Sequence, residues 1–145
     1  MAGLCSHEGI SHYLPLRTET KIYQRRRVTV TKPLFPGYVF ARFTPEQRVT
    51  LLKSNAVVRI IEAPRQRELL HQLAQIRKAL LIDPSLGACE AIKAGRRVQV
   101  TAGPFQGIEG IVASVKGHTL VRLNIELIGQ AVALEIERDA LALLD

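Results

Sequence analysis

Residues 32–40 read KPLFPGYVF, and this stretch decides how the first half of the chain folds. Its prolines and its glycine predict a bend over residues 33–37. The aromatic and β-branched residues that follow predict a strand over residues 38–43. Because side chains alternate across a strand, we expect Tyr38 and Phe40 to lie on one face of it.

A basic run lies on the N-terminal side of this stretch. Arg25, Arg26 and Arg27 are consecutive, and they precede the sequence VTVT at residues 28–31. The alternation of VTVT predicts a half-buried strand. Three arginines beside a strand indicate a hairpin tip or an exposed loop. Such a tip either contacts phosphates or is simply solvated, and both interpretations stay open here.

Two helices and one further strand are expected on the C-terminal side. Thr44 and Gln47 have the spacing of a capping box, which predicts a helix over residues 45–54. Residues 57–61 read VVRII and predict a strand. The second helix is predicted by the spacing of four apolar residues that would share one helical face, namely Leu69, Leu73, Ile76 and Leu80. The first half is therefore expected to be an α+β domain.

The second half has a different hydrophobic period. Apolar residues alternate with polar ones in short runs separated by glycines, which predicts a small β-barrel. The sequence DPSLG opens residues 83–92, which we expect to link a domain at 1–82 to one at 93–145. The net charge changes sign at the same place. Residues 1–82 carry 14 Lys and Arg against 5 Asp and Glu, whereas residues 83–145 carry 6 against 8. This asymmetry predicts two modules with different partners.

Composition excludes several classes of protein. No run in the 145 residues approaches the ~20 apolar residues of a membrane span, and no signal peptide is recognisable. Two cysteines exclude a disulfide-rich scaffold and favour a reducing cytosol. Cys5, His7 and His12 are rejected as a metal site, because a structural zinc site needs four ligands. With no catalytic constellation in the sequence, we expect a binding protein without a cofactor rather than an enzyme.

Two motifs resemble one protein family. KPLFPGYVF at residues 32–40 resembles the signature of the NusG N-terminal domain, and VQVTAGPFQGIEG at 98–110 is similar to the NusG form of the KOW domain. The resemblance covers nearly the whole chain. It implies an α+β N-terminal domain, with an antiparallel sheet and flanking helices, followed by a small SH3-like all-β barrel. It also implies a bacterial, cytoplasmic factor in transcription elongation or antitermination.

The resemblance implies particular partners as well. Members of the family dock their N-terminal domain on the clamp helices of the RNA polymerase β′ subunit, close to upstream DNA. Their KOW domain contacts a second protein, such as a small-subunit ribosomal protein or the Rho terminator. We therefore expect a monomer that has these partners and no membrane attachment.

The sequence departs from the family pattern at two places. The family has an opening strand and most of a helix before the segment that corresponds to residues 9–15 (GISHYLP). Either the sequence has a truncated start, or the N-terminal sheet is incomplete and has an exposed edge. Ile128 stands where the family often has phenylalanine. The ending VALEI at residues 132–136 is more like the specialised, RfaH-like paralogues.

The candidate contact residues fall into three groups. Those expected to bind RNA polymerase are Phe35, Tyr38 and Phe40. Those expected to bind nucleic acid are Arg25, Arg26, Arg27 and Lys32. Those expected on the KOW partner surface are Phe105, Ile108 and Ile128. Apolar residues can equally fill a core. That alternative stays open for Phe35, Tyr38 and Ile108 and is favoured for Phe40 and Phe105, whereas Ile128 is the better surface candidate.

Two other functions remain as alternatives. A ribosome-associated KOW protein would use the basic, aromatic first half to bind RNA. A nuclease would need a cluster of carboxylates or histidines, which the sequence does not show.

Overall fold

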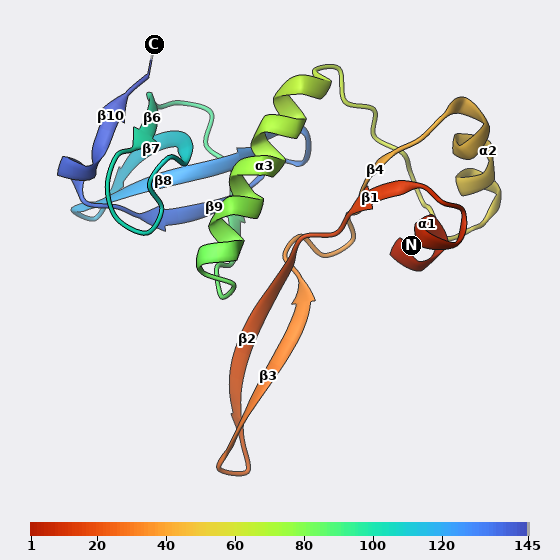
Figure 1. The fold of residues 1–145 in the computed structure, drawn as a ribbon, viewed down its shortest axis with the longest axis horizontal. Helices are drawn as coiled ribbons and strands as arrows, with labels where there is room; N and C mark the ends of the chain where they lie inside the picture. The colour runs from red at the N-terminus through yellow and green to blue at the C-terminus, as the bar shows by residue number, and fades with distance from the viewer. Residues whose placement is uncertain (145) are drawn as a thin grey trace. The chain divides into compact units, whose positions relative to one another are not determined.

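The computed structural model describes residues 1–144. Its contacts divide the chain into two units. The first unit contains residues 1–16 and 33–62, and the second contains residues 17–32 together with the chain from residue 63 onward. Figure 1 shows the elements in chain order from red to blue. The two units are described separately below.

The first unit contains two short helices and a two-stranded sheet. These elements are α1 (Ala2–His7), β1 (Ser11–Tyr13), β4 (Phe40–Arg42) and α2 (Pro45–Lys53). β1 and β4 pair antiparallel, with Tyr13 opposite Phe40. Its core cluster contains Cys5, Ile10 and Leu51, against which Leu4, Phe43, Val57 and Ile60 pack. The expected antiparallel sheet with flanking helices is therefore present, although each described strand is only 3 residues long.

The capping box at the start of α2 is confirmed. The Thr44 Oγ1 atom accepts a hydrogen bond from the Gln47 N–H at 3.2 Å, and the Gln47 Oε1 atom accepts one from the Thr44 N–H at 2.9 Å. Pro45 occupies the first turn, where its missing N–H costs nothing. The sequence therefore defined the beginning of this helix.

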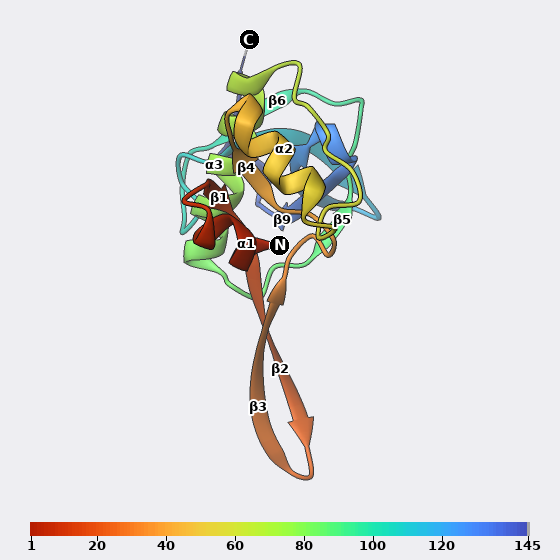
Figure 2. The same cartoon turned by 90° about the vertical axis from the view of Figure 1, so that its right-hand side faces the viewer.

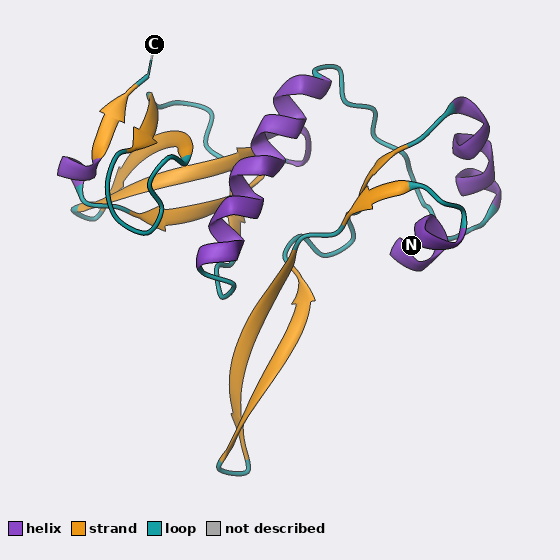
Figure 3. Cartoon of the chain, in the orientation of Figure 1, coloured by secondary structure: helices purple, strands orange, loops and turns teal. Residues whose placement is uncertain are grey.

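The expected strand at residues 57–61 is wrong. This segment has no regular secondary structure, and Figure 3 shows it within the teal loop between α2 and α3. Val57 and Ile60 pack on the core cluster, whereas Val58 is fully exposed. A strand needs a neighbouring strand, and β1 of the first unit pairs with β4 instead. β-branched composition therefore misled the prediction, because strand propensity depends strongly on context.

The second unit begins with a hairpin of β2 (Leu16–Tyr23) and β3 (Arg26–Pro33). Gln24 and Arg25 form its turn with φ values of 48° and 65°, the left-handed geometry that suits a two-residue hairpin turn. The tip expected at the arginine run is confirmed. The expected half-burial is wrong: Val28 and Val30 are exposed, and within residues 1–144 this ribbon has only its two strands.

Hydrogen bonds hold the base of the hairpin to the segment that follows α3. The Thr18 N–H donates to the Pro84 carbonyl at 2.8 Å. The Arg17 guanidinium donates to the carbonyls of Leu86 and Ser85 at 2.9 and 2.8 Å. The ribbon is thus fixed at its base.

The long helix α3 (Gln66–Ile82) confirms the predicted apolar face. Leu73, Ile76 and Leu80 are buried, and the helix packs against β8 of the sheet described next. The buried side chain of Gln75 accepts a hydrogen bond from the Glu109 N–H at 2.9 Å. Gln72 accepts one from the Glu126 N–H at 3.2 Å. The helix is thus joined to the sheet by apolar packing and by two glutamines.

The rest of the second unit is a six-stranded antiparallel sheet in the order β10-β6-β7-β8-β9-β5. Its strands are β5 (Ala88–Glu90), β6 (Arg97–Val100), β7 (Glu109–Val115), β8 (His118–Ile125), β9 (Gln130–Glu135) and β10 (Leu141–Leu143). The 3₁₀ helices η1 (Glu126–Ile128) and η2 (Arg138–Ala140) lie between strands. The α+β class and the all-β second half agree with expectation, whereas closure into an SH3-like barrel stays a prediction.

The segment expected to be a linker contributes to this sheet. Residues 83–92 contain β5, which pairs with β9 so that Cys89 lies opposite Ala131. The Cys89 thiol also receives a hydrogen bond from the Arg122 guanidinium at 3.0 Å. The segment is therefore not a free linker over its whole length. Where independently folding domains begin and end stays a prediction.

A carboxyl pair beside α3 makes the stability of this unit depend on pH. The pKa of Glu126 is raised mainly by burial. The hydrogen bond with Glu68 and the negative charge of Glu68 raise it further. The folded chain therefore keeps this proton at a pH where the unfolded chain loses it. The stabilising contribution is complete below the unfolded pKa and is lost as the pH rises through the folded pKa.

We therefore expect Glu126→Gln to leave stability unchanged at about pH 3, where the carboxyl is protonated in both states. At neutral pH the substitution should raise the free energy of unfolding by less than about 1 kcal/mol, because Glu126 is exposed. Thermal unfolding at the two pH values measures this, with the exposed Glu137→Gln as control. An equal gain at both pH values would contradict the explanation.

Candidate functional site

Lys32 is paired with a carboxylate at the base of the hairpin. Its Nζ atom forms an ion pair with the Glu19 Oε2 atom, and Arg17 Nη1 lies 3.7 Å from the same oxygen. The hydrogen bond from Lys32 lowers the pKa of Glu19. Glu19 therefore balances charge at the base of the hairpin, which makes Lys32 the weakest of the four expected nucleic-acid contacts.

The other three predicted contacts lie at the tip of the hairpin. Arg25 lies in the turn and Arg26 and Arg27 begin β3, and all three side chains are exposed. Among residues 1–144, no carboxylate forms an ion pair with any of them. Figure 2 shows the two strands as a long, twisted ribbon that ends in this turn. The structure therefore brings three unneutralised guanidinium groups together.

The sequence-based prediction missed three neighbours of these arginines. Lys21, Ile22 and Tyr23 end β2 and are exposed, with Ile22 at 78% and Tyr23 at 68% of their surface. A tyrosine two residues before a basic run was the signal that could have found them. Guanidinium groups bind phosphate oxygens in pairs of hydrogen bonds, and an exposed aromatic ring can stack on a base. The tip therefore has the chemistry of a nucleic-acid interface.

The three aromatic residues predicted to bind RNA polymerase differ in exposure. Phe35 is only 1% exposed, and its ring meets that of Phe40 edge to face, with centroids 6.5 Å apart. Tyr38 and Phe40 are half-buried. Of the two alternatives kept open for Phe35, the structure favours the core, since this side chain has almost no free surface. Contact with polymerase through Tyr38 and Phe40 stays a prediction.

The three residues of the predicted KOW surface also differ in exposure. Ile108 is 1% exposed and belongs to the core of the sheet. Phe105 is half-buried in the loop between β6 and β7. Ile128 is half-buried at the end of η1, beside Gly129, whose φ of 65° ends the turn. Ile108 therefore offers a partner no surface, whereas Phe105 and Ile128 keep part of theirs.

Neither a metal-binding cluster nor a membrane-spanning helix is found within residues 1–144. No group of three or more His, Cys, Asp or Glu side chains is placed to hold a metal ion. No helix in this range is long and apolar enough to cross a membrane.

The fold and these surfaces define an α+β protein whose exposed basic ribbon is typical of proteins that meet nucleic acid. The family model described as NusG, transcription termination factor nusG, matches residues 2–79. The match covers the hairpin, the KPLFPGYVF stretch and most of α3. The chain belongs to the NusG family. Membership indicates a factor in transcription elongation or antitermination that binds RNA polymerase, and factors of this family are not enzymes.

Proposed function

We propose that this chain is a specialised, RfaH-like transcription elongation or antitermination factor that binds the clamp helices of the RNA polymerase β′ subunit. The match to the NusG family over residues 2–79 carries the proposal. Tyr38 and Phe40 supply the contact surface, and Phe35 supports Phe40 from the core through the edge-to-face contact of their rings. A polymerase held closed in this way pauses less, so that downstream genes are reached.

The hairpin tip supplies a second contact, with DNA at the upstream edge of the transcription bubble. Arg25, Arg26 and Arg27 are exposed and unneutralised, which favours phosphate binding over a merely solvated tip. This contact is electrostatic and independent of sequence, because phosphates carry no base information. It therefore adds affinity for any transcribing polymerase without selecting an operon.

The second half acts as a KOW domain that contacts another protein, a small-subunit ribosomal protein or Rho. Ile128 is the centre of this surface, and Phe105, which is also half-buried, belongs to it. The proposal rests on the resemblance of residues 98–110 to the KOW motif and on the partial exposure of Ile128. The protein works as a monomer in the bacterial cytoplasm.

We expect Ile128→Glu to abolish capture of the KOW partner while the sheet stays folded. The new carboxylate would lie in an apolar contact and would lose its hydration there. The effect is measured by comparing how well the native chain and Ile128→Glu capture the purified ribosomal protein and Rho. Circular dichroism shows whether the variant stays folded. A matched control is Leu70→Glu, which alters an exposed leucine of α3. Undiminished binding by folded Ile128→Glu would contradict the assignment.

A ribosome-associated protein that binds RNA is the second candidate. The exposed Tyr23 beside the arginines favours it, since aromatic stacking suits single-stranded RNA. Affinity capture from a bacterial extract separates the two functions. The proposed function predicts retention of the polymerase β′ subunit after nuclease treatment. Retention of ribosomes without polymerase would establish the second candidate instead.

A further inference from the structure

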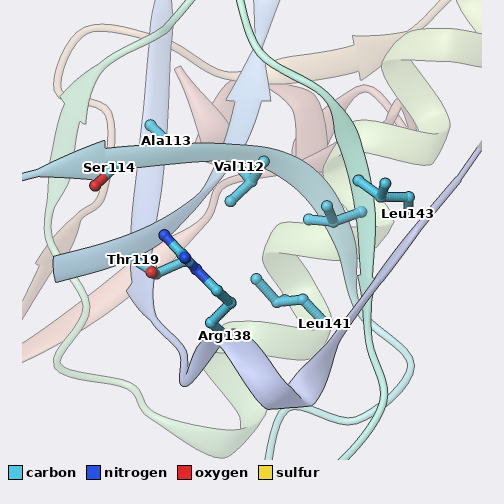
Figure 4. A pocket seen from close by; sticks show the side chains of 8 residues that line it. Val112, Ala113, Ser114, Thr119, Arg138, Leu141 and Leu143 are labelled. Atoms are coloured by element: carbon cyan, nitrogen blue, oxygen red, sulfur yellow. The ribbon is translucent and has the colours of Figure 1, made fainter.

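We propose that a hollow at one end of the six-stranded sheet binds an extended segment of a partner protein through an acidic side chain. The hollow has a volume of about 350 Å³. Val98, Val112, Leu141 and Leu143 form its apolar walls, and Arg138 is the only charged residue that lines it among the described residues. Figure 4 shows Val112, Leu141, Leu143 and Arg138 among the side chains that line it.

The strand register places most of the lining on one face of the sheet. Val98 lies opposite Leu143, Val112 opposite Val121, and Ser114 opposite Thr119. Directly opposed residues project to the same side, and Val121 on this side is fully buried. The hollow is therefore the open end of the core face of the sheet. Leu143 keeps 55% of its surface exposed there.

Arg138 provides the charge that selects the partner. Arg138 and Thr119 line the same hollow (Figure 4), and among residues 1–144 no carboxylate forms an ion pair with Arg138. Its neighbours Glu137 and Asp139 are exposed and do not pair with it either. A carboxylate would accept charge-assisted hydrogen bonds from this guanidinium, and the Ser114 and Thr119 hydroxyls can donate to it as well.

Within residues 1–144, the hollow has one cationic group, the Arg138 guanidinium, and apolar walls around it. A partner segment with one carboxylate next to an apolar side chain would match both features. Nucleic acid is disfavoured, because phosphate backbones are bound by several cations together.

The edge of the sheet points to an extended protein segment. β10 is an edge strand whose pairing within the described chain is with β6 alone. Its outer N–H and C=O groups are open to an added strand, the mode in which many extended peptides bind.

This surface lies away from the proposed KOW contact. β7 begins near the loop of Phe105 and ends at Val115, and β8 runs back from His118 towards Ile128. Ser114 and Thr119 therefore lie at the opposite end of these strands from Phe105 and Ile128. The inference thus adds a further protein contact to the chain, one that does not depend on the KOW contact.

Amide NMR titration of the full chain tests the proposal with a terminally blocked peptide, Thr-Val-Glu-Leu-Thr-Val. We expect shifts confined to β10, Arg138, Ser114 and Thr119. A matched peptide with glutamine in place of glutamate should bind about fivefold more weakly, the scale of one exposed ion pair. Arg138→Gln should bind both peptides equally, whereas Arg96→Gln, an exposed arginine outside the hollow, should keep the preference.

A charge reversal provides the sharper test. Arg138→Glu should prefer a peptide with lysine in place of glutamate, and it should discriminate by a similar factor. Equal binding of the glutamate and glutamine peptides by the native chain would overturn the proposal. So would shifts centred on Phe105 and Ile128, or no shift at about 5 mM peptide. A last titration uses the small carboxylate 4-methylpentanoate. If it binds as tightly as the peptide, the hollow is a small-molecule site instead.

Discussion

Replacing Gly110 by alanine is expected to destabilise the six-stranded sheet by about 3 kcal/mol, the upper end of the cost of overpacking a core. Gly110 lies in β7, opposite Val98 of β6. A Cβ atom built there would lie 2.6 Å from the Val121 Cγ1 atom and 2.7 Å from the Arg122 carbonyl oxygen. A side chain can rotate away, but the carbonyl belongs to β8 and can move only with that strand.

Thermal unfolding measures this prediction. A loss of this size should lower the melting temperature by 10 °C or more for a domain of this length, if unfolding is two-state. Gly87→Ala is the matched control, because its nearest neighbour would be Arg17 Nη2 at 4.0 Å, which is ordinary contact. Melting of Gly110→Ala close to that of Gly87→Ala would show that the sheet is not packed as described.

Neutralising the hairpin tip is expected to weaken DNA binding about 100-fold at low salt. The variant carries Arg25→Asn, Arg26→Gln and Arg27→Gln, with asparagine at residue 25 because it tolerates the left-handed φ of 65°. Each phosphate contact releases counterions on binding. The slope of log K against log salt should therefore become shallower by about 3 on duplex DNA.

Fluorescence anisotropy with duplex DNA at several salt concentrations provides both quantities. The control removes three exposed arginines elsewhere, with Arg67→Gln, Arg77→Gln and Arg96→Gln, so the change in net charge is the same. That control should bind DNA nearly as the native chain does. Equal losses in the two triple variants would mean that net charge, and not the hairpin tip, attracts DNA.

Local sequence signals predicted the elements whose causes are local. The Thr44 and Gln47 capping box and the apolar face of α3 are confirmed because both depend on residues within a few turns. The tip at Arg25 is confirmed for the same reason. Alternating apolar residues predicted strands in β6 to β9 because their partners follow directly along the chain.

Partners distant in the sequence account for the errors. Residues 57–61 have strand composition but no strand beside them, and β5 lies in the expected linker because β9 offers it an edge. Val28 and Val30 alternate as in a half-buried strand, yet no layer covers them. Sequence alone could not decide which edges and faces would be occupied, because burial is a property of the whole fold.

The candidate site was predictable to a similar extent. Residue type identified Arg25 and its neighbours as a charged tip, but not that Glu19 would pair with Lys32. Apolar composition identified Phe35 and Ile108 but could not separate core from surface, and both are buried. Arg138 escaped notice because nothing in its local sequence shows that it lines a hollow with residues from four strands.

The most direct test of the account is a transcription assay with the cognate RNA polymerase on a template that contains a strong pause. The native chain is predicted to shorten the pause and to increase full-length transcript. Tyr38→Ala should lose most of this effect while keeping its melting temperature, and Val58→Ala, a fully exposed control, should retain it. If the native chain leaves pausing and transcript length unchanged while it binds ribosomes, the proposal of an elongation or antitermination factor is contradicted.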